Sequence, residues 1–375
     1  MNVWRGHHGD DLAARVTRAW DRNELLVLCP PALKDFSFRK VPLDSDHVLG
    51  VFTSGTLSAT PRLVLYTKAN ILASLDAVFG LFDRHRIEHV FCYPQAFHTF
   101  GLTLGYVAAH VHGWRLHTPI GKYSAASHAQ RLALREDRVL TLGTPTHFFD
   151  LARIARDTGI APSYSCIIGG ASVSRELWRS VRDDLRIEAP SVGYGCTEAS
   201  PAITHLAPGL EPAMDGDVGT PLGNLDARLV KDGVEISGPS LCSAIIQNGA
   251  LARPRSLVIR DRLVEQNGRW RYEGRLDLTL NRGGQKFSLE AIERELRARL
   301  ATDVVACSVR DARLGEDLGL MIQSDSPALV VTASSVLRDE FGLRLNPERA
   351  RLAREFPLNE CSKLDRRAVA REVET

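Results

Sequence analysis

Hydrophobic positions come mostly in short runs, which alternate with stretches of helical periodicity over the first two hundred residues. The runs predict buried strands, and the stretches, with apolar residues every three or four positions, predict amphipathic helices. Strands are predicted at 47–54, 89–94, 138–145 and 164–172, and helices at 69–85, 124–137, 146–159 and 173–185. This alternation predicts an α/β fold, with a mainly parallel sheet covered by helices on both faces.

The pattern changes after about residue 215. Residues 226–238 and 260–275 are strand–turn–strand patterns with Asp-Gly and Asn-Gly turns. Beyond Arg275, helices are predicted at 288–300 and 334–342, with a strand between them. We therefore expect a large N-terminal domain over 1–275, with mainly parallel sheets flanked by helices and a β-rich subdomain, and a small α+β C-terminal domain over 276–375.

Composition narrows the class of protein. A net charge of +2 gives no reason to expect a nucleic-acid or anionic-membrane partner. The seven cysteines are isolated and contain no CxxC pair, which favours neither a disulfide framework nor a zinc site and fits a reducing, cytoplasmic compartment. The first residues lack the apolar core of a signal peptide, and no apolar run approaches the roughly 18 residues of a membrane span.

The stretch VFTSGTLSATPRLVLYTK at 51–68 is rich in small and hydroxyl residues. Glycine lets a backbone approach a ligand closely, hydroxyl and N–H groups donate to phosphate oxygens, and Arg62 could neutralise their charge. No Walker motif is present. Taken alone, the stretch is either an ordinary surface hairpin or a phosphate-binding loop.

Three further segments carry candidate ligand contacts. His98 lies between aromatic residues in YPQAFHTFG at 93–101 and is either a core residue or a pocket residue. IIGGAS at 167–172 ends a predicted strand, where open α/β sheets bind ligands. In VGYGCTEAS at 192–200, Tyr194 could stack on a ring, and Glu198 could bind Mg²⁺ or belong to an N-cap box.

Two charged residues in the last third complete the candidates. Asp261 precedes one arm of a predicted hairpin and could bind ribose hydroxyls or serve as a turn residue. Lys363 is one of seven lysines in an arginine-rich chain and offers a compact charge on a flexible stem. A surface lysine without a role is the alternative.

The order of these segments is more informative than any one of them. From about residue 48 to residue 370 the chain resembles the adenylate-forming superfamily, which includes acyl- and aryl-CoA synthetases, non-ribosomal peptide adenylation domains and firefly luciferases. The resemblance is carried by FTSGTLSATPR, YPQAFHTFG, IIGGASVSREL, YGCTEASP, GDVGTPLGN, GVEISGPSL, YEGRLDLTLNRGGQKFSLEAIE and PLNECSKLDR, in that order.

The resemblance implies a role for each matching position. It implies ATP and Mg²⁺ as cofactors, with Glu198 holding the metal and Lys363 bridging the carboxylate and the α-phosphate. Thr197 would lie beside the α-phosphate, and Asp277 would be the hinge of a rotating C-terminal domain. The other implied contacts are Thr53, Ser54, Gly55, Thr56 and Arg62 to the β- and γ-phosphates, Gly169, Gly170, Ala171, Gly193, Tyr194 and Gly195 around the adenine and acyl pockets, and Asp261 and Arg275 to the ribose.

The chain departs from the family pattern in four places. The phosphate loop lacks its second glycine, has one added residue, and carries Arg62 in place of lysine. Asp261 aligns with the family aspartate only after a one-residue shift. Asn359 and Ser362 stand where Thr and Gly are common. TSGT begins at residue 53, well before its usual place, so the resemblance implies a shortened N-terminal region.

The resemblance implies a carboxylate ligase that forms an acyl-adenylate and transfers the acyl group to a thiol. Amino-acid-activating relatives usually carry Asp just after the His98 position, whereas this chain has Thr99, which favours an aryl or acyl acid. His98, Phe97 and Phe100 would line the acid pocket. The acceptor is expected to be CoA or the phosphopantetheine of a separate carrier protein. The alternative is a non-catalytic nucleotide- or acyl-binding protein derived from the same fold.

Overall fold

The structure, a computed structural model, describes residues 2–5, 10–30, 33, 46–54, 61–119, 124, 126–127, 138–158, 163–359 and 363–374. The chain divides into two compact units. The first unit comprises residues 1–259 and 263–272, and the second comprises residues 260–262 and 273–375.

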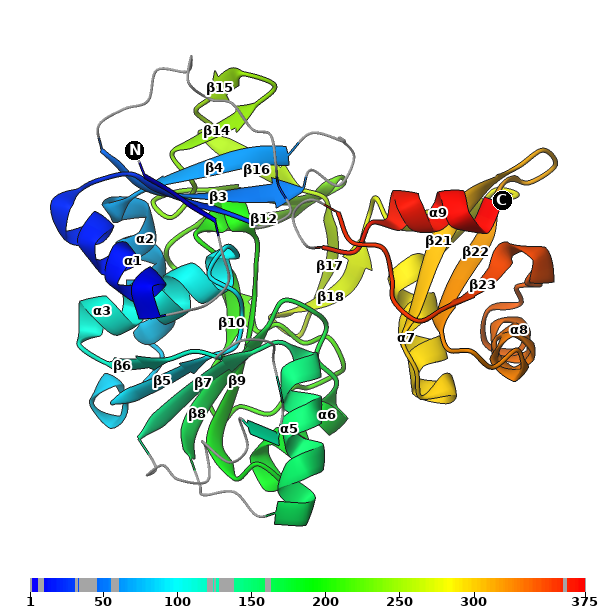
Figure 1. Cartoon of the computed structure of the whole chain (residues 1–375), viewed down its shortest axis with the longest axis horizontal. Helices are drawn as coiled ribbons and strands as arrows, with labels where there is room; N and C mark the ends of the chain where they lie inside the picture. The colour runs from blue at the N-terminus through cyan, green and yellow to red at the C-terminus, as the bar shows by residue number, and fades with distance from the viewer. Residues whose placement is uncertain are drawn as a thin grey trace. The chain divides into compact units, whose positions relative to one another are not determined.

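Among the described residues, the first unit contains three sheets of three or more strands (Figure 1). The first has the order β1 (Asn2–Arg5), β2 (Leu26–Cys29), β3 (His47–Ser54), β4 (Pro61–Thr67), β14 (Ala244–Gln247), β15 (Ala250–Ala252). The second has the order β11 (Thr220–Pro221), β10 (Ala202–Leu206), β9 (Ile187–Gly195), β8 (Ser163–Gly169), β7 (Val139–Gly143), β5 (His89–Cys92), β6 (Arg115–His117). The third joins β12 (Asp226–Val230), β13 (Gly233–Ser237) and β16 (Ser256–Ile259).

The expected α/β architecture is present, and the second sheet is parallel from β6 through β9. The first sheet is mixed, because β3, β4, β14 and β15 pair antiparallel. The described helices of this unit are α1 (Asp10–Arg22), α2 (Lys68–Phe79), α3 (Ala108–His112), α5 (Pro145–Thr158) and α6 (Arg175–Asp183), with a π-helix, η2 (Phe100–Val107), leading into α3 and short 3₁₀ turns η1 (Arg84–Arg86) and η3 (Thr197–Ala199).

Alternating side chains of the second sheet point into two different cores. Leu140 and Leu142 of β7 pack into the core that contains α1, α2 and η2. Val139, on the other face, packs with Phe148 of α5 and Trp178 of α6. Because a strand presents successive residues to opposite faces, every residue of β7 is buried, on one side of the sheet or the other.

Two expected helices need comment. The helix expected over 69–85 ends at Phe79, so its last turn is wrong. The amide of Gly80 still bonds to the Asp76 carbonyl, but the chain then turns and forms the 3₁₀ turn η1, capped by Asp83. The helix expected over 124–137 lies almost entirely outside the described residues.

The Asp-Gly and Asn-Gly hairpins are confirmed. Asp226 pairs with Ser237 across the first hairpin. Asn267 and Gly268 both have positive φ, 55° and 75°, at the turn between β17 (Asp261–Gln266) and β18 (Arg269–Arg275). Positive φ at both central residues is the geometry of a type I′ turn, which Asn-Gly favours.

The second unit is built on one five-stranded sheet. Its strands are β19 (Thr279–Arg282), β20 (Gln285–Ser288), β21 (Val304–Asp311), β22 (Gly315–Gln323) and β23 (Ala350–Ala353), and its helices are α7 (Leu289–Leu300), α8 (Ala328–Phe341) and α9 (Arg366–Glu374), with a 3₁₀ turn η4 (Pro347–Arg349). Ser288 caps α7 by accepting a hydrogen bond from the Ala291 amide. α8 begins six residues before the predicted helix at 334–342.

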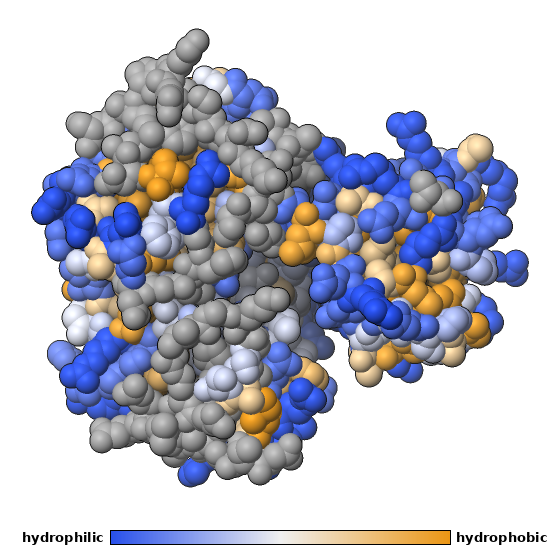
Figure 2. Space-filling model, in the orientation of Figure 1, coloured by the Kyte–Doolittle hydropathy of each residue, from blue (hydrophilic) through white to orange (hydrophobic). Residues whose placement is uncertain are grey.

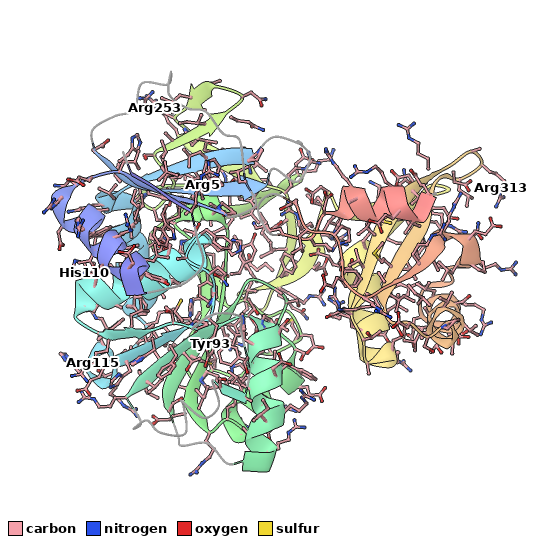
Figure 3. All side chains as sticks on the ribbon, in the orientation of Figure 1. Arg5, Tyr93, His110, Arg115, Arg253 and Arg313 are labelled. Carbon is pink, nitrogen blue, oxygen red and sulfur yellow. The ribbon has the colours of Figure 1, made fainter. Side chains whose placement is uncertain are left out.

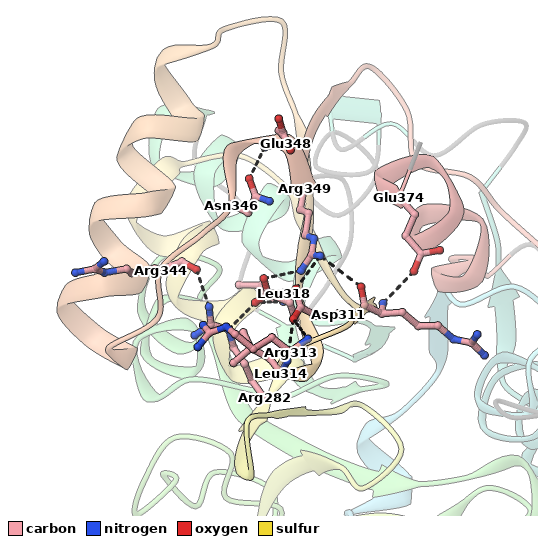
Figure 4. A network of polar contacts seen from close by, with 12 residues as sticks. Arg282, Asp311, Arg313, Leu314, Leu318, Arg344, Asn346, Glu348, Arg349 and Glu374 are labelled. Carbon is pink, nitrogen blue, oxygen red and sulfur yellow. Dashed lines mark hydrogen bonds and ion pairs between the residues drawn. The ribbon is translucent and has the colours of Figure 1, made fainter.

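Charged residues of the second unit pair with one another. Asp317 is buried and accepts hydrogen bonds from Arg282 and Arg349, and Arg349 also pairs with Asp311 at 3.0 Å (Figure 4). On the face drawn in Figure 2, hydrophilic residues surround small groups of hydrophobic ones on this unit. The two arginine contacts of Asp317 hold β19, β22 and η4 together and compensate its buried charge.

Candidate active site

In the structure, the stretch at 51–68 contributes to the two antiparallel strands of a hairpin. β3 and β4 pair antiparallel, with Thr53 opposite Arg62 and Ser54 opposite Pro61. Thr53 is buried. The predicted phosphate contacts Gly55 and Thr56 lie outside the described residues. The hairpin geometry is compatible with both sequence interpretations, because a phosphate loop can join two paired strands.

Thr197 and Glu198 form a tight turn just beyond the end of β9. They begin the 3₁₀ turn η3, whose N-cap is Cys196 and has no side-chain cap bond, so the N-cap box interpretation is wrong. The Cys196 amide donates to the Pro201 carbonyl, and the Cys242 amide donates to the Glu198 carbonyl, each within 2.9 Å. The backbone of Glu198 is therefore fixed from two sides.

Arg62 of β4 pairs with Glu198 across 136 residues of sequence. The Arg62 Nη2 to Glu198 Oε1 distance is 2.8 Å, and the Glu198 side chain is 9% exposed while that of Arg62 is 31% exposed. The Nε of Arg62 is buried and has no hydrogen-bond partner among the described residues. The arginine that replaces the family lysine thus compensates the charge of the predicted metal ligand and keeps one donor available.

Tyr66 of β4 links three of the predicted motifs and is a site residue that sequence reasoning missed. Its hydroxyl lies 2.9 Å from the Thr197 carbonyl oxygen and 3.3 Å from Thr99 Oγ1. Tyr66 and Thr99 are both buried. The available signal was a tyrosine at an inward position of an otherwise aliphatic strand.

Two glycines meet at the ends of β8 and β9. Gly169 pairs with Gly193, and a Cβ on Gly169 would lie 3.3 Å from the ring of Phe100, the second residue after His98. Gly170 has φ of +86° and is exposed, as are Ala171 and Gly195. Parallel strands β5, β7, β8 and β9 end at this edge, which is where α/β sheets bind ligands.

The side chains nearest this edge are aromatic and polar. Tyr194 is half-buried, and its ring centroid lies 5.9 Å from that of Tyr272. Tyr93, at the end of β5, lies inside the unit (Figure 3) and stacks on His147 at 5.5 Å. His147 Nδ1 accepts a hydrogen bond from the Thr144 amide. Tyr93 and His147 were not predicted, although their position after strands β5 and β7 could have suggested them.

His98 is half-buried beside Phe97, with ring centroids 4.8 Å apart. Its carbonyl accepts the Leu102 amide, so His98 sits at the start of η2. This position agrees equally with a packed residue and with a pocket residue.

Asp261, Arg275 and Lys363 belong to the second unit. Asp261 is the buried first residue of β17, so it is not a surface turn residue. Arg275 Nε lies 4.0 Å from Asp261 Oδ1, but its guanidinium bonds bidentately to Asp277 at 2.7 and 2.9 Å. Arg275 is therefore held mainly by the residue predicted as a hinge.

The backbone of Lys363 is hydrogen-bonded to Asn359. The Asn359 amide donates to the Lys363 carbonyl at 2.7 Å, and the Lys363 amide donates to Asn359 Oδ1 at 3.1 Å. Leu358 and Leu364 form an isolated bridge. Asn359, one of the departures from the family pattern, thus fixes the backbone of the predicted catalytic lysine.

The residues present can accommodate Mg²⁺ only together with substrate oxygens. Among the described residues, no group of three or more His, Cys, Asp or Glu side chains could hold an ion. Mg²⁺ is usually bound by one or two carboxylates plus phosphates, and Glu198 supplies one carboxylate.

None of the helices in the described ranges is long and apolar enough to cross a membrane.

Comparisons with known proteins agree with the motif order. The model of the AMP-binding enzyme family matches residues 11–239. An acyl-CoA ligase, sidI, of Aspergillus fumigatus is 29% identical over 184 residues, which cover 47% of this chain and 30% of that protein. The 2-succinylbenzoate–CoA ligase of Escherichia coli is 32% identical over 159 residues, 40% of this chain and 33% of that one.

Solved structures show the same fold. The o-succinylbenzoate-CoA synthetase of Bacillus subtilis, in complex with its acyl-adenylate intermediate, has a TM-score of 0.75 at 15% identity and covers 98% of this chain and 87% of that one. An anthranilate-CoA ligase bound to anthranoyl-AMP has a TM-score of 0.69 at 17% identity, with 92% and 73% covered. The alignments with the first curated relatives span less than two thirds of their lengths. The chain belongs to the AMP-binding enzyme family.

Proposed function

We propose that the protein activates an aryl or acyl carboxylic acid with ATP as an acyl-adenylate and transfers the acyl group to a thiol. The observation that carries the proposal is the Thr197–Glu198 turn, held against β4 by Arg62 and adjoining the ligand-binding edge of a parallel sheet. Family membership and the curated relatives named as CoA ligases support the same reaction.

In the first step a carboxylate oxygen attacks the α-phosphorus of ATP. A bond forms between that oxygen and phosphorus, the bond from phosphorus to the bridging oxygen of pyrophosphate breaks, and pyrophosphate leaves. In the second step a thiolate sulfur attacks the acyl carbon and AMP leaves. Both partners of the first step are anions, so the site must supply positive charge and hold the reacting atoms in line.

The first unit would supply phosphate contacts from β3, β4 and the turn. Arg62 offers its guanidinium, and Thr53 and Thr197 offer hydroxyls. Glu198 would hold Mg²⁺ together with phosphate oxygens, and the ion would neutralise charge on the leaving pyrophosphate. Arg62 then exchanges part of its interaction with Glu198 for one with phosphate, for which its Nε is available.

The remaining site residues are assigned from their motifs. We assign Gly169, Gly170, Ala171 and Tyr194 to the adenine and acyl pockets, with His98 lining the acid pocket. In the second unit, Asp261 is assigned to the ribose hydroxyls with Arg275, and Lys363 to the charge that develops between carboxylate and α-phosphate. The carbonyl of Gly193 and the ring of Phe100 fill the space beside Gly169, so no side chain fits at that position.

Substrate and acceptor follow from smaller observations. The buried hydroxyl of Thr99 cannot compensate a substrate ammonium, which supports an acid without an α-amino group. CoA is the favoured acceptor, because curated relatives are CoA ligases, and a carrier-protein phosphopantetheine is the alternative. No disulfide joins the described cysteines, in keeping with a reducing, cytoplasmic compartment.

Carboxylate-dependent exchange of pyrophosphate into ATP tests the proposal. Purified protein with a panel of benzoates, cinnamates and fatty acids should exchange with at least one acid. Lys363→Ala should abolish exchange and leave ATP binding, measured by calorimetry, mostly intact. ATP binding without exchange by any acid would instead indicate a nucleotide-binding protein of the same fold, and unchanged exchange in Lys363→Ala would remove Lys363 from the mechanism.

A further inference from the structure

The side chain of Tyr66 is packed in an apolar core. Tyr66 belongs to the core formed with Val51, Val64, Leu75 and Leu102, and none of its surface is exposed. A buried tyrosine hydroxyl needs hydrogen-bond partners. Both partners of Tyr66 come from motifs distant in sequence, Thr99 and Thr197, which are 33 and 131 residues away.

The direction of both hydrogen bonds follows from the donors available. The Thr197 carbonyl oxygen can only accept, so Tyr66 donates its single hydroxyl hydrogen there, at 2.9 Å. At 3.3 Å Thr99 Oγ1 must then be the donor to the Tyr66 oxygen. The result is one ordered chain of hydrogen bonds from Thr99 through Tyr66 to Thr197. Burial raises the pKa of Tyr66 well above its ordinary value, so the chain stays protonated throughout the neutral range.

Tyr66 and Arg62 act on the same turn from the same strand. Residues four apart on a strand face the same side, and Arg62 bonds to the Glu198 side chain while Tyr66 bonds to the backbone of the preceding residue. β4 therefore holds the turn at two points. Arg62 can release its contact when phosphate arrives, but Tyr66, fully buried, keeps its own.

We propose that Tyr66 is a positioning residue that fixes the Thr197–Glu198 turn relative to β4 and to Thr99. This inference rests on the proposed adenylation reaction. Tyr66 does not touch the reacting atoms. Its hydroxyl sets where the Thr197 and Glu198 side chains lie before ATP and acid bind. Without it, the Thr197 carbonyl and the Thr99 hydroxyl each lose a partner, and the turn can shift.

Tyr66→Phe removes the hydroxyl and keeps the ring. Tyr164→Phe is a matched control, because Tyr164 is a buried tyrosine of β8 whose hydroxyl also bonds to a backbone group, the Asp83 amide, away from the predicted motifs. Both variants are compared with wild type for thermal stability, and for kcat and KM of pyrophosphate exchange with ATP and with the acid.

A positioning role predicts that kcat falls while the KM values for ATP and for the acid change little. Tyr66→Phe should lower kcat by roughly 10- to 100-fold, the cost of a small misplacement of catalytic groups, with much smaller changes in either KM. Tyr164→Phe should lose a similar amount of thermal stability and keep the wild-type kcat. Thr99→Val should reduce kcat less once Tyr66 is already phenylalanine than in the wild-type background, because the two residues form one chain.

Two negative results are distinguishable. If wild type exchanges pyrophosphate and both tyrosine variants keep its kcat, the hydroxyl of Tyr66 is only structural and the inference fails while the proposed function stands. If wild type exchanges with no acid of the panel, the proposed function fails and the positioning role fails with it.

Discussion

Two buried glutamates, one in each unit, both pair with arginine but differ in the number of hydrogen bonds that they accept. Glu293 of α7 bonds to Arg366 and Arg297 and accepts the Ala306 amide. Glu198 has a single side-chain hydrogen bond within the described part of the chain, from Arg62. Glu293 is saturated with partners that belong to its own fold, whereas Glu198 retains capacity for another ligand. A buried carboxylate with one replaceable partner is the better candidate for a metal ligand.

Removing the charge of Glu293 should have the largest effect on stability. Glu293→Gln removes the buried charge that pairs with both Arg366 and Arg297, so it should cost about 3 kcal/mol. Hydrogen exchange of the α7 and β21 amides measures the loss in the second unit. Glu295→Gln on the same helix, which breaks a partly exposed pair with Arg299, should cost less than about 1 kcal/mol and serves as control. Equal losses would mean that saturation does not distinguish the two kinds of glutamate.

The same change at Glu198 should affect the reaction instead. Glu198→Gln should lower pyrophosphate exchange by about 100-fold, because the carboxylate that would hold Mg²⁺ beside the phosphates is lost. The free energy of unfolding should change by less than about 1 kcal/mol, because Arg62 is partly exposed and water can solvate it. A stability loss as large as that of Glu293→Gln would make Glu198 a structural residue.

His205 of β10 extends the comparison to a buried group that has no partner. Neither of its ring nitrogens has a hydrogen-bond partner in the described ranges, and burial lowers its pKa from 6.5 to about 4. The unfolded chain binds the proton more tightly, so the stability that neutral His205 confers is complete above about pH 6.5 and is lost as the pH falls toward 4.

Between pH 6.5 and 5 this residue should account for a loss of about 2 kcal/mol of unfolding free energy. Chemical denaturation at several pH values measures it, and His205→Leu should flatten that slope whatever its absolute stability. A slope unaltered by His205→Leu would contradict the assignment.

The smallest effect is expected from exchanging the cation that partners Glu198. Arg62→Lys keeps the positive charge but loses the planar guanidinium. The rate of pyrophosphate exchange should therefore fall by less than about tenfold. The KM for ATP should account for most of that change. A loss as large as in Glu198→Gln would show that the guanidinium geometry itself is required.

Local signals in the sequence were sufficient for much of the fold. The Asn267–Gly268 turn and the helix predicted over 288–300 depend on neighbouring residues, and both form where the pattern indicates. The helix expected over 69–85 ends early, at Phe79. It was predicted too long because apolar residues continue past Gly80, and periodicity alone cannot show that Leu81 and Phe82 follow a turn.

The site was less accessible from the sequence. The motif order identified Arg62 and Glu198 separately, but no local pattern could show that they pair with each other. Tyr66 was missed for the same reason: its role depends on two partners brought near only by folding. Runs of apolar residues in the sequence predict the strands of the sheets. Single polar contacts between strands and loops depend on the tertiary structure and leave no local pattern.

Two glycines at the ends of β8 and β9 also limit how the gene can vary. A Cβ on Gly195 would lie 1.8 Å from the carbonyl oxygen of Pro201, a backbone atom that cannot move aside. At Gly170 the restriction is conformational, since φ is +86° and the nearest atom is 3.6 Å away, so asparagine is a conceivable replacement there. Among functional variants of a randomised library, codon 195 should therefore remain glycine while codon 170 drifts. The two positions distinguish a glycine required for space from one required for backbone conformation.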